Sequence, residues 1–230
     1  MRPPGEFTFH KTGNPWFSWH YVATHGHDIL TATQQHVTLT LASIVLGAAV
    51  SIPLAVLARR AHWLRAAVLG LCNALYAVPS LAFVVALAKI FNLSRLTIII
   101  PLAAYSLVIF VRNILTGLDE VSGEAVEAAR GMGFSDARIF LRVRLPMAVP
   151  TMIAGLRLAV VSTIELVVIG GFVGQGGYGA MIFQGYHDNF YKQQMTTYLI
   201  LSVLLALFAD GLILALGRFL TPWRRGLAST

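Results

Sequence analysis

Residues 112–146 read RNILTGLDEVSGEAVEAARGMGFSDARIFLRVRLP, and this is the longest polar stretch in the interior of the chain. It lies between two strongly apolar runs, at about 96–111 and 147–173. Charged side chains are frequent within it and nearly missing on both sides. We therefore expect the polar stretch to lie in water and its neighbours to lie in an apolar environment.

The polar stretch carries the signals of two short helices. Ser122 can cap the first helix, because its hydroxyl can accept a hydrogen bond from a free backbone N–H at the helix start. Gly131 and Gly133 are expected to end that helix, and Ser135 to begin the second. Pro146 is expected to stop the second helix and to open the next apolar run. The prediction is two short helices with a glycine joint.

Hydrophobic residues dominate the rest of the chain. They make up 57% of the 230 residues, while charged residues make up 12%, against roughly 25% in an average soluble domain. A helix needs about 20 apolar residues to cross a bilayer core, and a soluble protein of this size could not bury five such stretches. We therefore predict an all-α integral membrane protein of about five transmembrane helices. The expected spans are 37–58, 66–88, 96–111, 147–173 and 195–216.

The charge and the cysteine count exclude several classes of protein. The formal net charge of +7 would fit nucleic acid, an acidic partner or a membrane surface, and the apolar excess favours the lipid bilayer over nucleic acid. A single cysteine excludes a disulfide framework and a thiolate metal cluster built by this chain alone. The seven histidines show no regular ligand spacing, so no metal site is expected.

The distribution of basic residues predicts the orientation. If the amino terminus lies outside, eleven of the 17 basic residues fall on inside segments and five on outside segments, and Arg157 lies in a span. Cytoplasmic loops carry the excess of Lys and Arg, so the amino terminus is predicted outside and the carboxyl terminus inside. Residues 1–36 then form an extracytoplasmic tail with an interfacial aromatic segment, 37–220 the membrane domain, and 221–230 a cytoplasmic tail.

Within the polar stretch, seven residues follow a spaced pattern: Glu127, Ala128, Ala129, Gly133, Val143, Leu145 and Pro146. The pattern resembles the EAA loop of ABC importer permeases, with Val143 in place of the usual isoleucine. The resemblance extends from about residue 14 to the end of the chain. It implies a MetI-like type I permease fold with a cytoplasmic coupling-helix loop, in a bacterial or archaeal cell membrane.

The resemblance also implies partners. The coupling loop would dock into a groove on a dimer of ATP-binding subunits, which would hold ATP and Mg, since this chain has no G-x-x-x-x-G-K-[ST] loop. Neither is expected as a cofactor of this chain, which would be a non-catalytic subunit. A second permease, identical or homologous, and an extracytoplasmic substrate-binding protein would complete an importer that works by alternating access.

The chain is most similar to permeases of osmoprotectant importers, which carry glycine betaine, choline, carnitine and related compounds. Three stretches support this similarity: Tyr76-Ala77-Val78-Pro79-Ser80, Gly155-Leu156-Arg157 and the glycine-rich residues 171–179. A permease for an amino acid such as methionine is an alternative, because methionine importers share much of the plan. A further alternative is a secondary transporter or channel whose polar loop only resembles the motif.

Three charged residues fall inside predicted spans: Arg157, Glu165 and Asp210. Charges in hydrocarbon are costly and should face protein or water. Eight residues separate Arg157 from Glu165, so the two lie about 80° apart around the helix and pair poorly. Glu165 is a candidate for the path of a cationic substrate, together with Arg157 and Tyr76; structural pairing of the charges is the alternative.

Gly174, Gly176 and Gly179 spell G-x-G-x-x-G, with Gly177 among them. A dinucleotide site needs this pattern between a strand and a helix, whereas here it follows a predicted span. We interpret the glycines as a tight turn at the outer end of that span, packed against the loop that follows.

Overall fold

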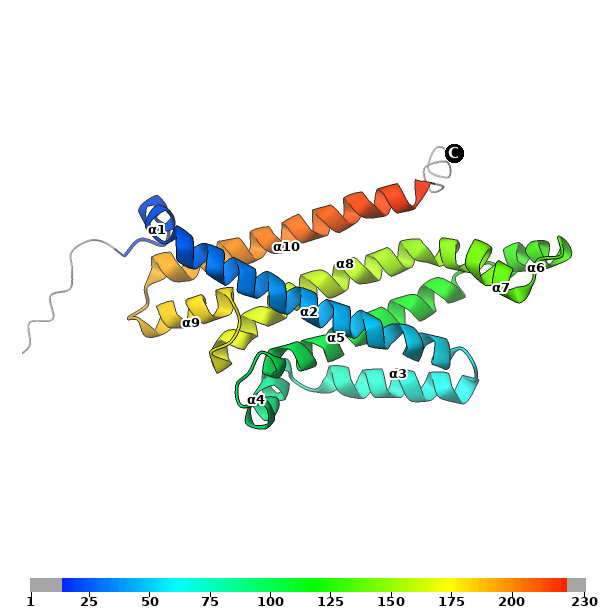
Figure 1. The fold of residues 1–230 in the computed structure, drawn as a ribbon, viewed down its shortest axis with the longest axis horizontal. Helices are drawn as coiled ribbons and strands as arrows, with labels where there is room; N and C mark the ends of the chain where they lie inside the picture. Colours follow the sequence, from blue (N-terminus) through cyan, green and yellow to red (C-terminus); the bar gives the residue numbers. More distant parts are fainter. Residues whose placement is uncertain (1–13, 223–230) are drawn as a thin grey trace, which may run out of the picture.

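A computed structural model describes residues 14–222, and this part of the chain is helical without β-strands. The membrane bundle and its connections are drawn in Figure 1. In chain order the helices are α1 (Trp19–Thr24), α2 (Gly26–Ala58), α3 (His62–Ala77), α4 (Ser80–Phe91), α5 (Leu96–Asp119), α6 (Gly123–Gly131), α7 (Asp136–Ile139), the π-helical η1 (Phe140–Arg144), α8 (Leu145–Ile169), the 3-10 helix η2 (Gly170–Val173), α9 (Tyr178–His187) and α10 (Lys192–Leu220).

The long helices α2, α5, α8 and α10 run along the long axis of the molecule (Figure 1). The short helices α6 and α7 lie at one end, where α10 also ends, and α1 and α9 lie at the opposite end (Figure 1). Four helices of the described chain are long and apolar enough to cross a membrane, and the bent pair α3–α4 passes the same test as a fifth. The predicted all-α membrane fold is confirmed.

The second apolar run differs from the expected single span over 66–88. It forms two helices, α3 and α4, with a bend of 90° between them. Val78 is extended, with φ −70° and ψ 126°, because a residue that precedes proline is driven away from helical dihedrals. The Tyr105 hydroxyl donates a hydrogen bond to the Val78 carbonyl that the bend exposes. The region 66–88 therefore belongs to a bent pair of helices and not to one straight helix.

The first and third spans are longer than expected. Helix α2 begins at Gly26, and α5 continues into the polar stretch as far as Asp119. The added polar side chains of α5 find partners on α3: Arg112 donates to Asn73 at 2.5 Å, and Asp119 binds Arg65 at 2.5 Å. These contacts between distant segments extend the helix beyond its apolar part.

Pro146 does not end the helix before it. Helices α7, η1 and α8 follow one another without a break, and Asp136–Val173 forms a single helical rod of 38 residues. The proline lies in the first turn of α8, directly after the π-helical turn. In a π-helical turn the hydrogen bonds span five residues, whereas in an α-helix they span four. Proline supplies no backbone N–H, and we attribute the continuity of the helix at Pro146 to this change of hydrogen bonding.

Small residues allow the long helices to approach closely. At Gly47 of α2, an added Cβ would lie 2.0 Å from the Ser106 hydroxyl oxygen of α5, and at Gly155 of α8 it would lie 2.4 Å from Asn113 Cβ of α5. Such small-residue contacts are typical of membrane helix packing.

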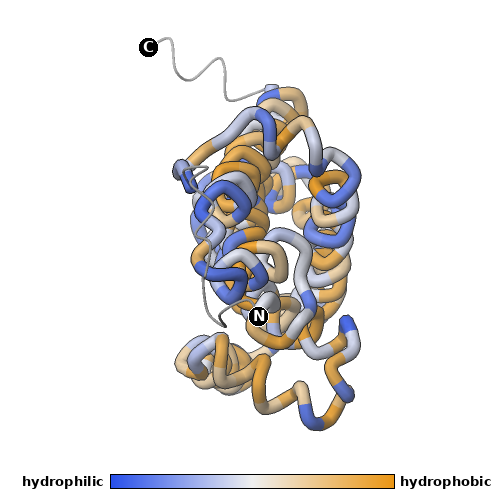
Figure 2. Tube along the Cα trace, turned by 90° about the vertical axis from the view of Figure 1, so that its left-hand side faces the viewer, coloured by the Kyte–Doolittle hydropathy of each residue, from blue (hydrophilic) through white to orange (hydrophobic). Residues whose placement is uncertain are grey.

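Hydrophobic residues also recur around the outside of the bundle (Figure 2), including the exposed Leu207 and Phe208 of α10. The surface therefore suits lipid.

Candidate functional site

The polar stretch forms a helical hairpin whose ends are capped as predicted. The Ser122 hydroxyl accepts a hydrogen bond from the Ala125 amide at 3.3 Å. Gly133 joins the two helices with a positive φ of 78°, a conformation that glycine adopts easily. The Ser135 hydroxyl then accepts from the Arg138 amide at 3.4 Å. The short first helix, the glycine joint and the start of the second helix at Ser135 are as predicted, whereas the second helix continues into α8.

The hairpin has a small hydrophobic core of its own. Val126 and Ala129 of α6 pack with Ile139 of α7, and Phe134 and Val143 flank them. Ala129 is only 1% exposed. Its side chain fills the contact between the two hairpin helices.

The outer face of the hairpin is free for a partner. Glu127 and Ala128 are exposed, and Glu127 has no hydrogen bond or ion pair with any residue between 14 and 222. Two large apolar side chains are also exposed, Met132 at 67% and Leu141 at 61%. Sequence reasoning missed them. The available signal in the sequence was that the hairpin contains more apolar residues than its small core can bury.

The second part of the motif connects the hairpin to the membrane bundle. Val143, Leu145 and Pro146 are all half-buried. Val143 packs against the hairpin core, and Leu145 lines a cavity shared with Ile114 of α5. These motif residues therefore lie where the hairpin meets α8 and its neighbour α5.

The charges inside the spans are partly paired. The Arg157 guanidinium of α8 donates two hydrogen bonds to the Asp210 carboxylate of α10, at 2.7 and 2.8 Å. This two-point geometry is the strong form of the interaction. The sequence did not identify the pair, because the two residues are 53 positions apart and only the packing of α8 on α10 brings them together.

Glu165 faces the same cavity as this ion pair. The cavity has a volume of about 930 Å³ and lies between α8 and α10. Glu165 is exposed and makes no hydrogen bond or ion pair within residues 14–222. Since Arg157 and Asp210 neutralise each other, Glu165 gives the cavity a net negative charge.

Tyr76 lies in a different cavity, of about 300 Å³, at the bend between α3 and α4. Its ring meets the Tyr105 ring edge-on, with the ring centres 6.3 Å apart, and the Arg112 guanidinium carbon lies 5.7 Å from its centre. The three candidate path residues therefore fall into two cavities: Arg157 and Glu165 share one, and Tyr76 lines the other.

The glycine-rich turn packs tightly on two helices. An added Cβ at Gly177 would lie 2.6 Å from the Ala32 carbonyl oxygen of α2, and one at Gly179 would lie 2.1 Å from the Val168 carbonyl oxygen of α8. Gly174, Gly176 and Gly177 have positive φ. No strand precedes this turn anywhere in residues 14–222, so the dinucleotide pattern has no structural support.

His36 is a core residue that sequence reasoning placed in the tail. It is fully buried, its ring stacks on Tyr178 at 4.5 Å, and its Nε2 lies 3.0 Å from the Ile164 carbonyl oxygen of α8. His36 thus ties α2 to α8 and to the start of α9. Its helical spacing from Ala32 and Leu39, which are also buried, was the available signal.

Long apolar helices with a capped hairpin at one end define a multi-pass membrane subunit that is built to contact a partner outside the bilayer. Residues 37–222 match the family described as "Binding-protein-dependent transport system inner membrane component", and the chain belongs to this family. It is the non-catalytic permease subunit of an ABC importer in the inner membrane; a separate ATPase and a substrate-binding protein are its partners.

Named relatives cover most of the chain. A carnitine transport permease protein of Listeria monocytogenes is 32% identical over 74% of this chain and 77% of its own length. A choline transport system permease protein of Bacillus subtilis is 30% identical over 88% and 93%. An osmoprotectant import permease protein of Salmonella typhimurium is 31% identical over 88% and 96%.

Solved structures share the fold. A chain of the inward-facing MetNI methionine ABC transporter aligns with a TM-score of 0.76, covering 86% of this chain and 98% of that one, at 21% identity. A chain of an amino acid ABC transporter solved with histidines aligns at 0.75 and 14% identity, covering 87% and 98%. At these identities the likeness concerns the fold alone.

Proposed function

We propose that this permease subunit imports osmoprotectant quaternary ammonium compounds, such as glycine betaine, choline or carnitine. The observation that carries the proposal is the agreement among relatives from three genera, whose names refer to carnitine, choline or osmoprotectant import at 30% to 32% identity. An amino acid such as methionine is the weaker candidate, because the likeness to that transporter is at 21% identity and extends only to the fold.

The hairpin is proposed to couple ATP use to transport. Its exposed face offers the unpaired Glu127 carboxylate for a basic group of the ATPase, and Met132 and Leu141 for an apolar groove. ATP and Mg are proposed to bind the ATPase dimer rather than this chain. Closure of that dimer would draw the hairpins together and open the spans outward, and hydrolysis would restore the inward-facing state.

The orientation is proposed with the amino terminus outside and the carboxyl terminus in the cytoplasm. It is supported by α10, which ends toward the same end of the molecule as the hairpin, and by α1, which lies at the opposite end (Figure 1). The exposed rings of Trp16 and Trp19 suit the outer membrane interface. The basic residues Arg2, Lys11, Arg224 and Arg225, and most of the predicted 221–230 tail, lie outside the described residues.

Glu165 is proposed to line the translocation path. Its carboxylate is unpaired and faces a cavity wide enough for a small organic cation, and a carboxylate attracts a quaternary ammonium group. Arg157 then acts by holding Asp210 and joining α8 to α10. Tyr76 offers a separate aromatic wall at the α3–α4 bend, and the turn from Gly174 to Gly179 is proposed to lie near the external gate.

Ligand binding by the partner substrate-binding protein tests the substrate class. We expect glycine betaine, choline or carnitine to bind it, and uptake of the bound compound to require this permease. Binding of methionine alone would contradict the proposal. Co-purification tests the assembly: the permease should carry an ATPase dimer and a second permease, and mass measurement of the complex distinguishes an identical from a homologous second chain.

A further inference from the structure

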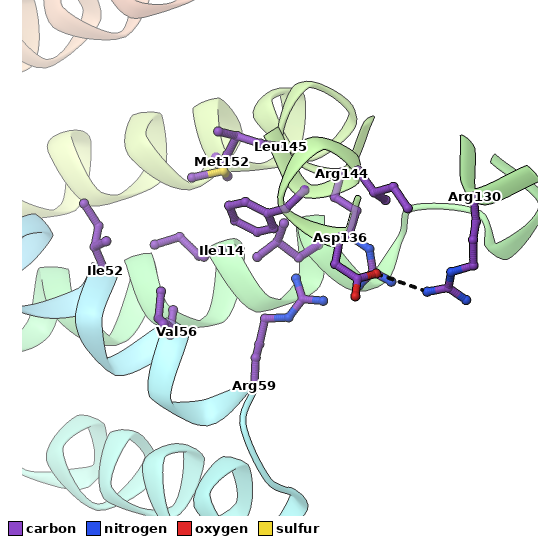
Figure 3. A pocket seen from close by; sticks show the side chains of 13 residues that line it. Ile52, Val56, Arg59, Ile114, Arg130, Asp136, Arg144, Leu145 and Met152 are labelled. Carbon is purple, nitrogen blue, oxygen red and sulfur yellow. Dashed lines mark hydrogen bonds and ion pairs between the residues drawn. The ribbon is translucent and has the colours of Figure 1, made fainter. Parts of the chain in front are cut away.

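A cavity of about 650 Å³ lies between α2, α5, α8 and the hairpin (Figure 3). It has two unlike ends. Arg59, Arg130, Arg144 and Asp136 line the end next to the hairpin, while the remaining lining residues are apolar. A mostly apolar cavity with guanidinium groups at one end fits an amphiphile with an anionic head.

Arg59 gives the strongest indication that this cavity binds a ligand. Its Nη1 atom is buried and has no hydrogen-bond partner among residues 14–222, and its guanidinium points into the cavity (Figure 3). Guanidinium groups carry five N–H donors, and a buried donor without an acceptor is destabilising. Burial lowers the pKa of Arg59, and the nearby Arg144 charge lowers it further. An anion bound here would accept a hydrogen bond from the unpaired Nη1 and would offset the repulsion between the two arginines.

The carboxylates near the cavity are already engaged. Asp136 is the one carboxylate in the described lining, and it binds Arg130 at 3.4 Å. The Asp119 carboxylate binds an arginine of α3 at 2.5 Å. Neither Arg59 nor Arg144 has an ion-pair partner within residues 14–222. The lining therefore carries three guanidinium groups and one carboxylate, an excess of two positive charges.

The polarity of the cavity follows the long axis of the bundle. Val56 and Ile52 lie one and two turns before Arg59 on α2, and Met152 lies two turns beyond Arg144 toward the middle of the bundle. At a rise of 1.5 Å per residue, the apolar wall reaches about 10 Å inward from the arginines. Ile52 and Val56 are 57% and 51% exposed, so this apolar wall of the cavity is accessible from outside the described chain.

We propose that this cavity binds an anionic phospholipid of the cytoplasmic leaflet, with its phosphate between Arg59 and Arg144 and its acyl chain along Ile52, Val56 and Met152. The proposal rests on the orientation given under the proposed function. The hairpin forms one wall of the cavity and the spans form the other. A bound lipid therefore joins the part that contacts the ATPase to the membrane bundle, and stabilises one hairpin position.

Lipid retention by the purified transporter tests this site. The complex with its ATPase is incubated with equal amounts of phosphatidylglycerol and phosphatidylcholine, and retained lipid is counted by native mass spectrometry. Arg59→Gln should lower phosphatidylglycerol affinity about fivefold, the effect of one basic residue near a lipid phosphate. Arg60→Gln is the matched control, because Arg60 is the exposed neighbour and does not line the cavity.

A second variant addresses the acyl chain without changing charge. Ile52→Trp fills the apolar end of the cavity, and we expect it to lower retention as Arg59→Gln does. Equal retention by wild type, Arg59→Gln and Ile52→Trp would overturn the proposal, as would an equal loss in Arg60→Gln, which would indicate general surface attraction. Loss of ATPase binding in Arg59→Gln with unchanged lipid would assign Arg59 to the ATPase instead. Because retention is read without transported substrate, a wrong substrate class leaves the result unaffected.

Discussion

Gly47 of α2 is the point where an added methyl group should separate two membrane helices. An alanine Cβ there would lie 2.0 Å from the Ser106 hydroxyl oxygen and 2.8 Å from the Ala103 carbonyl oxygen, both on α5. Non-bonded heavy atoms prefer about 3.5 Å, so Ser106 would have to retreat by about 1.5 Å. Ser106 is fully buried and hydrogen-bonded to the Ser43 and Ala103 carbonyls. Moving the Ser106 hydroxyl would break these hydrogen bonds, so we expect the helices themselves to move apart.

The expected magnitude combines two opposing effects. Overpacking a tight contact destabilises by about 1–3 kcal/mol, and the severity of this contact places Gly47→Ala near the upper value. Alanine is better than glycine within a helix by about 1 kcal/mol. The net loss is therefore about 2 kcal/mol, which lowers the melting temperature of a chain of this size by roughly 4–8 °C.

The matched control is Gly70→Ala, because Gly70 also lies within a helix but an added Cβ there meets nothing within 4 Å. Thermal unfolding of the purified permease in one detergent should show a lower melting temperature for Gly47→Ala and an equal or higher one for Gly70→Ala. Ser106→Ala should restore part of the loss in Gly47→Ala, since the Ala103 carbonyl remains in the way. A Gly47→Ala protein as stable as wild type would refute the close approach of α2 and α5.

Three further substitutions test the coupling face and the charged cavity. Glu127→Gln should reduce uptake several-fold at equal membrane levels of the permease, and it should weaken co-purification of the ATPase. The control Glu124→Gln, on the same helix, should leave uptake and co-purification near normal. Equal effects of the two substitutions would contradict a specific contact at Glu127. Asp210→Asn should lower the yield of folded permease in fluorescence-detected size exclusion, because it leaves the Arg157 charge unpaired, and adding Arg157→Gln should recover yield. Glu165→Gln should lower uptake of a cationic substrate without lowering yield, and full transport by this variant would exclude the path role.

The sequence was most informative where short-range rules apply. Runs of about 20 apolar residues predicted the long helices, and the caps at Ser122 and Ser135 predicted the hairpin, because each depends on neighbours within four residues. The positions of the prolines did not reliably predict where helices end. Pro79 marks a bend of 90°, whereas Pro146 lies within a continuous rod, shortly after a π-helical turn.

Contacts between distant segments were beyond sequence reasoning. The extension of α5 to Asp119 depends on Arg65 of α3, and the pairing of Arg157 with Asp210 depends on how α8 and α10 pack. The polar residues were visible in the sequence, but their partners were not. The local structure of the hairpin could consequently be predicted, whereas the residues that share each cavity could not.

The continuity of the rod Asp136–Val173 explains how a contact at the hairpin can act at the far end of the bundle. At 38 residues it is about 55 Å long, and it carries the hairpin's second helix at one end and the glycine-rich turn at the other. The hairpin's second helix is part of this rod, and the Arg157–Asp210 pair joins the rod to α10. The π-helical turn Phe140–Arg144 is the irregular part of the rod between the hairpin and the span, and it lies beside the cavity that Arg144 lines.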